Sequence, residues 1–206
     1  GGIARSIKFG SSNAVNSERT YNVAMQLITL GILLLHAIYI GIIYLFSRKD
    51  KIFLMFTLLL VAAVFSISLD EDKVLLAVWP FDYAAAKKIS LFAYAAMTTL
   101  MLKIAVSFCL EKARQRKYNV YFALAGLYGL FIAVAPIEAV LLSAKFGIFT
   151  IATLFPSIWV PLLLVRYVLQ KDRNGIFLLI AAAGMTSTMI WGGFKNLGSV
   201  EPGFYA

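Results

Sequence analysis

The sequence predicts an all-α protein, a polytopic bundle of transmembrane helices with six spans in this segment. Hydrophobic residues make up 61% of the 206 positions and charged residues only 14%, against roughly 25% charged in a typical soluble domain. A membrane helix needs about 20 apolar residues, so about 126 apolar positions supply six of them. The mean hydropathy of +0.85 agrees. This composition excludes a soluble enzyme, a disordered chain and a nucleic-acid partner.

The first residues differ from the rest of the chain. Ile3, Ile7 and Phe9 alternate loosely with smaller and polar residues, and Gly10-Ser11-Ser12 ends the run. That pattern is typical of a last β-strand followed by a turn, and a linker is the alternative. We therefore expect residues 1–20 to be the tail of an upstream extracellular domain with its linker, and residues 21–206 to be the helical bundle.

Six apolar runs follow the tail, and each is long enough to span a bilayer. Short connections between them favour an antiparallel bundle of sequential neighbours. No internal repeat supports an inverted-repeat transporter. Two prolines inside the fifth run, Pro156 and Pro161, each remove a backbone hydrogen bond and are candidate helix pivots. The expected spans are residues 23–46, 52–69, 89–110, 118–142, 147–169 and 175–194.

The connections indicate how the bundle is oriented. Alternate connections carry ten cations on one side of the membrane and five on the other, and the richer side is expected to be cytoplasmic. This places the N-terminus outside the cytoplasmic membrane of a bacterium. Six spans return the chain to the outside, so Phe204-Tyr205-Ala206 are expected to begin a seventh span. A complete bundle of six spans is the alternative. The ten cations are Arg48, Lys49, Lys51, Lys112, Arg114, Arg116, Lys117, Arg166, Lys171 and Arg173.

Residues for covalent chemistry are missing from this segment. His36 is the only histidine, so neither a serine protease site nor a multi-histidine metal or haem site can be assembled. Zinc-helix and phosphate-loop motifs are also absent from the sequence. We therefore expect no catalytic residue, no metal and no cofactor here.

Three ionisable residues fall inside the expected spans, and such residues are functional candidates because burial in lipid is costly. They are His36, Lys103 and Glu138. At 1.5 Å per residue, His36 lies about 20 Å and Lys103 about 21 Å from the outer ends of their spans, whereas Glu138 lies only about 6 Å from its own. This difference in depth argues against a Lys103–Glu138 ion pair.

Each candidate also has a structural interpretation. Lys103 lies on a row with Ala95, Thr99 and Ser107, each four residues apart, that is expected to face the bundle interior; the alternative is that its amine extends to the cytoplasmic interface. His36 lies on a polar stripe of the first span, or is a core histidine with satisfied hydrogen bonds. Glu138 is expected either to line an outward-facing cavity or to reach water.

Small residues form a row on the sixth expected span. Gly184, Thr188 and Gly192 repeat every four residues, and such rows let helix backbones approach closely. Packing inside the bundle and packing between two copies are both compatible with this row.

The first part of the bundle resembles a known family. The aromatic-rich residues 39–46, the turn Ser47-Arg48-Lys49-Asp50-Lys51, a short second span and an outer loop ending in Val78-Trp79-Pro80 are similar to the membrane module of bacterial seven-transmembrane receptors with diverse intracellular signalling modules. Two departures are Ile40, where an Asn is expected, and the missing seventh span. The resemblance covers roughly residues 1–200.

The resemblance implies a sensor that responds to an unknown extracellular ligand. It also implies a cytoplasmic effector in the same longer chain, most often a histidine kinase of a two-component system, otherwise a diguanylate cyclase or phosphatase, and a possible homodimer. Whether the whole protein is an enzyme depends on that effector. The alternative is a small transporter or ion-pathway protein using His36, Lys103 and Glu138, and a third possibility is a purely structural subunit.

Overall fold

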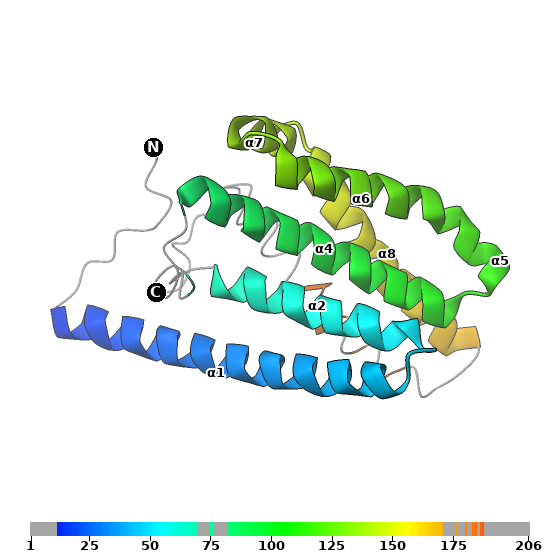
Figure 1. Ribbon diagram of the computed structural model, residues 1–206, viewed down its shortest axis with the longest axis horizontal. Coiled ribbons are helices and arrows are strands. Elements are labelled where there is room, and N and C mark those ends of the chain that lie inside the picture. The colour runs from blue at the N-terminus through cyan, green and yellow to red at the C-terminus, as the bar shows by residue number, and fades with distance from the viewer. Residues whose placement is uncertain are drawn as a thin grey trace.

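The computed structural model describes residues 12–69 and 82–170, together with positions 75, 176, 180, 183, 184, 186 and 187. Over these residues the protein is helical, and none of them forms a strand (Figure 1). The expected β-like tail lies outside the described residues. The all-α prediction is therefore confirmed for the described part of the chain.

Five long helices dominate the described residues, joined by shorter ones. The long helices are α1 (Ser12–Phe46), α2 (Lys51–Ser68), α4 (Tyr83–Cys109), α6 (Asn119–Val134) and α8 (Ile148–Gln170). The shorter ones are α5 (Lys112–Gln115), the 3₁₀ turn η1 (Arg116–Tyr118) and α7 (Ile137–Lys145).

Five stretches in these helices are long and apolar enough to cross a membrane. They correspond to the first five expected spans, with different ends, and are Thr20–Phe46, Lys51–Ser68, Tyr83–Cys109, Arg116–Val134 and Ile148–Leu169. Most of the sixth expected span lies outside the described residues, although Ile176, Ile180 and Ala183 are helical.

The expected fourth span is wrong at its outer end. Helix α6 stops at Val134, and Ala135 adopts an extended conformation with φ −65° and ψ 152°. Pro136 is the reason, because its ring disfavours a helical conformation in the preceding residue. The chain then starts the separate nine-residue helix α7. Glu138 therefore lies in the first turn of α7, outside the five candidate spans.

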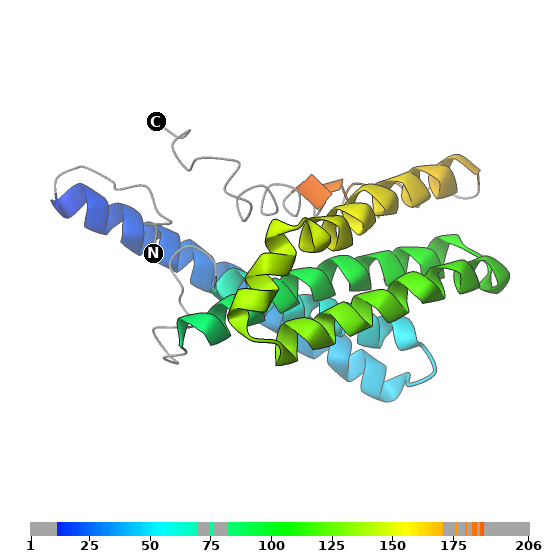
Figure 2. The same cartoon turned by 90° about the horizontal axis from the view of Figure 1, so that it is seen from above.

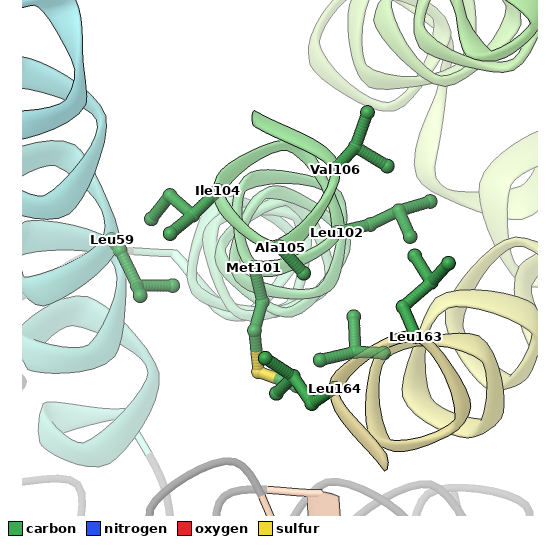
Figure 3. Close-up of a cluster of buried hydrophobic side chains, with 9 residues drawn as sticks. Leu59, Met101, Leu102, Ile104, Ala105, Val106, Leu163 and Leu164 are labelled. Atoms are coloured by element: carbon green, nitrogen blue, oxygen red, sulfur yellow. The ribbon is translucent and has the colours of Figure 1, made fainter. Parts of the chain in front are cut away.

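Helix α4 is the centre of the bundle. The long helices run alternately up and down, and α4 contacts α2, α6 and α8 (Figures 1 and 2). Figure 3 looks along α4 and shows Ile104 directed at Leu59 of α2, while Leu102 points toward α8. Leu102 is fully buried and Leu164 of α8 is 1% exposed. This cluster fixes how α4 and α8 lie against each other.

The basic connections gather at one end of the bundle. Figures 1 and 2 both place the α1–α2 turn, α5 and the last turn of α8 together at that end. These segments carry Arg48, Lys49, Arg114, Arg116, Lys117 and Arg166. The alternation of cations along the sequence thus becomes a charge difference between the two ends of the molecule.

Replacing Leu102 with Ala tests the central packing. We expect a loss of about 2 kcal/mol in the free energy of unfolding, the low end of the range for Leu→Ala in soluble cores, because in lipid mainly packing is lost. Leu124→Ala, at a position 61% exposed, is the control and should change the unfolding free energy by less than about 0.5 kcal/mol. Unfolding in mixed micelles of increasing SDS content measures both, and equal effects would contradict the packing described.

Candidate functional site

The three expected ionisable candidates lie apart, on α1, α4 and α7. All three side chains are exposed, and no hydrogen bond or ion pair joins them among the described residues. His36 does not lie in the core, because its side chain is exposed, and its Nδ1 lies 2.8 Å from the carbonyl oxygen of Ile32 in its own helix. Glu138 lies outside the candidate spans. The structure therefore assembles no continuous polar route from these residues.

The expectation that the whole Lys103 row faces the interior is wrong. Ala95 is buried, Thr99 is half-buried and Lys103 is exposed. A row of every fourth residue turns by about 40° per step around a helix of 3.6 residues per turn. Two steps carry the row from the buried side of α4 to its surface. The Lys103 ammonium lies 5.3 Å from the ring centroid of Phe122 on α6.

The row of small residues on the sixth expected span is described at one position only. Gly184 is helical and exposed, and among the described residues no atom outside its own stretch of helix lies within 4 Å of where its Cβ would be. Thr188 and Gly192 lie outside the described residues. The predicted packing role of this row stays a prediction.

Pro156 creates the most specific polar contact between spans. A proline lacks the N–H that would bond to the carbonyl four residues earlier, which here is the carbonyl of Ala152. Pro156 is less than 2% exposed, so water does not replace the missing bond at this proline. Instead the hydroxyl of Tyr121 on α6 donates to the Ala152 oxygen at 2.9 Å. The neighbouring helix thus supplies the partner that α8 lacks.

Helix α4 joins the same contact. Thr99 makes a side-chain hydrogen bond to Tyr121, so one phenol connects α4, α6 and α8. On α8 itself, the Thr153 hydroxyl donates to the Phe149 carbonyl at 2.9 Å and the Ser157 hydroxyl to the Thr153 carbonyl at 2.8 Å. Hydrogen bonds from a Ser or Thr hydroxyl to the carbonyl four residues earlier compete with the backbone hydrogen bonds of the helix and often bend it. The middle of α8 therefore departs from a regular hydrogen-bonding pattern.

Aromatic side chains surround this contact. The Phe155 ring lies 5.3 Å from that of Tyr121 and 5.7 Å from that of Trp159, centroid to centroid. The indole N–H of Trp159 donates to the Tyr118 hydroxyl at 2.8 Å. We call Tyr118, Tyr121, Ala152, Phe155, Pro156 and Trp159 the α6–α8 junction.

The α6–α8 junction joins two helices through side-chain hydrogen bonds. Its two interhelical hydrogen bonds are each made by one side-chain group, Tyr121 or Trp159. In an apolar site such a bond is strong but can be made or broken as a unit. The sequence indicated Pro156 as a pivot but not Tyr118, Tyr121 or Trp159. The only available signal was the carbonyl that Pro156 leaves free at Ala152.

A family model for seven-transmembrane domains with diverse intracellular signalling matches residues 22–206. The chain belongs to this family. The match confirms the resemblance that the turn at residues 47–51 and the outer loop indicated. The chain is accordingly a receptor-type membrane module of signalling proteins, and an integral membrane protein. Comparison with curated proteins gives no match, and comparison with solved structures gives none.

A double-mutant cycle tests the bond between Tyr121 and Ala152. Tyr121→Phe removes the donor, and we expect it to lower the free energy of unfolding by about 1 kcal/mol. Pro156→Ala restores the N–H that normally bonds the Ala152 carbonyl, so Tyr121→Phe should cost clearly less in that background, where only its bond to Thr99 is lost. The free energy of unfolding in SDS-containing micelles is measured for the wild type, the two single variants and the double variant. Tyr39→Phe, at a position 64% exposed, is the control, and an equal cost in both backgrounds would refute the interaction.

Proposed function

We propose that this module relays an extracellular or membrane signal to a cytoplasmic effector in the same longer chain. The family supports a role in signalling, and its resemblance implies a histidine kinase as the commonest effector. The observation that supports the proposal is the α6–α8 junction, where Tyr121 of α6 bonds the carbonyl that the buried Pro156 leaves without its helical partner. The ligand binds an upstream extracellular domain or reaches the outer end of the bundle.

The relay needs a difference in energy between two helix arrangements. A ligand shifts such an equilibrium only by its differential affinity for the two states. In one state Tyr121 bonds the Ala152 carbonyl, and in the other α8 has turned about Pro156 and Pro161 and the bond is broken. Since a net hydrogen bond is worth about 1 kcal/mol, losing it changes the ratio of the two states about fivefold. Helix α8 passes this change to the following spans and to the effector.

The orientation proposed for this relay has the N-terminus outside and the basic end of the bundle in the cytoplasm. The gathering of Arg48, Lys49, Arg114 and Arg116 at one end supports it, because cations of short loops are retained on the cytoplasmic side. A bacterial cytoplasmic membrane is the location that the family resemblance implies.

Cysteine labelling tests the orientation in intact cells. Cys109 is the only cysteine, so Cys109→Ser gives a background without thiols. In this background we expect Ser17→Cys to react with a membrane-impermeant maleimide and Ser47→Cys to react only after permeabilisation. The reverse pattern would show that the basic end lies outside.

Substitution of the two prolines tests the relay. In the full-length protein in its native membrane, Pro156→Ala and Pro161→Ala should each change the basal output of the effector by about fivefold, the ratio that one hydrogen bond supplies. Phosphoryl transfer is the readout for a histidine kinase. Pro136→Ala, in the connection between α6 and α7, is the control. Unchanged output in both α8 variants, with normal folding, would remove the pivots from the mechanism.

The gene sequence beyond residue 206 separates this proposal from the alternative. A seventh apolar run followed by a charged soluble domain is expected for the receptor. A stop codon directly after residue 206 would remove the route to the cytoplasm and favour a transporter. Ion or proton flux in liposomes carrying His36, Lys103 and Glu138 variants would then be the measurement.

A further inference from the structure

Among residues 101–105 of the central helix α4, only Lys103 is exposed. The two residues before it and the two after it are all buried, with Met101 6%, Leu102 0%, Ile104 8% and Ala105 4% exposed. Met101 and Ala105 lie about 160° around the helix from Lys103. The side chain of Lys103 is itself exposed. Its ammonium thus faces away from the α4–α8 core, toward the lipid.

No helix in contact with this part of α4 offers a carboxylate. The sequences of α2, α4, α6 and α8 contain neither Asp nor Glu. The contact given for the Lys103 ammonium is the ring face of Phe122 at 5.3 Å. A ring stabilises a cation by about 0.5–1 kcal/mol at an exposed site. The ring carries no net charge, so the positive charge of Lys103 has no anionic partner on these four helices.

The nearby end of the bundle adds positive charge. Lys103 lies six residues before Cys109, the last residue of α4, which is about 9 Å along the helix. The connection from Leu110 to Tyr118 carries four cations, Lys112, Arg114, Arg116 and Lys117, and one anion, Glu111. A lysine side chain reaches from this depth to the headgroup layer. An anion held there would contact the Lys103 ammonium beneath a strongly basic turn.

We propose that the α4–α6 surface at Lys103 and Phe122 binds the headgroup phosphate of an anionic phospholipid. The occupant is a lipid because the Lys103 side chain is exposed on the outer surface of a membrane-spanning helix and its ammonium lies against the apolar ring of Phe122. Basic sites between membrane helices are known to hold anionic headgroups. The lipid supplies the negative charge that α4 and the three long helices in contact with it lack.

Retention of phosphatidylglycerol by the full-length protein tests the site. The protein is assembled in phosphatidylcholine nanodiscs with increasing fractions of phosphatidylglycerol, and retained lipid is counted by native mass spectrometry after release. We expect Lys103→Gln to weaken retention about fivefold, the effect of one cation near the membrane surface. Lys103→Arg should retain the lipid, and Phe122→Leu should weaken retention about two- to fivefold. Lys145→Gln, on α7, is the control for general charge.

Several outcomes would overturn the proposal. Equal retention by wild type and Lys103→Gln would show that the ammonium is simply hydrated. Equal losses in Lys103→Gln and Lys145→Gln would indicate general surface attraction. Displacement of the lipid by millimolar inorganic phosphate would identify free phosphate as the ligand. If Lys103→Gln does not fold, Phe122→Leu decides, because it keeps the charge and removes only the ring.

Discussion

Backbone groups inside a bilayer must find hydrogen-bond partners within the protein, because no water is present to satisfy them. Pro156 leaves the Ala152 carbonyl without its helical partner in the middle of α8. That single unpaired oxygen requires a donor from another helix, and the hydroxyl of Tyr121 provides it at 2.9 Å. The position of α6 against α8, the aromatic contacts around Phe155 and the link to α4 through Thr99 are all consistent with this requirement.

A contact of this kind suits a protein that must change state. A regular helix would hold α8 by a full ladder of backbone bonds, and only unfolding would alter it. With Pro156 present, one bond of that ladder is replaced by a side-chain hydrogen bond from Tyr121 of α6. Such bonds can be exchanged at low cost, while the buried packing of Leu102 and Leu164 keeps α4 and α8 together. The buried packing thus lies between α4 and α8, and the hydrogen bond at the proline lies between α6 and α8.

The sequence predicted the elements that depend on composition and missed those that depend on neighbours. Apolar length alone placed α2 and α8 within two residues of their observed ends. The break after α6 was missed, although Pro136 signals it, because the apolar run continues across the break. Tyr121 was missed because its contact with α8 depends on how the helices pack in three dimensions, which the sequence pattern does not show. One interpretation placed Lys103 in the interior because residues four apart were assumed to share one face of the helix. Such a row in fact turns by about 40° per step around the helix.

The lipid-facing lysine and the proline junction use adjacent parts of one interface. Thr99 and Lys103 are one turn apart on α4, and their partners Tyr121 and Phe122 are neighbours on α6, with ring centroids 5.8 Å apart. A change in how Phe122 is held therefore acts directly on the residue that bonds the Ala152 carbonyl. Coupling between two binding sites is reciprocal. If the lipid proposed at Lys103 prefers one of the two proposed states of the junction, a signal that favours that state would also tighten lipid binding.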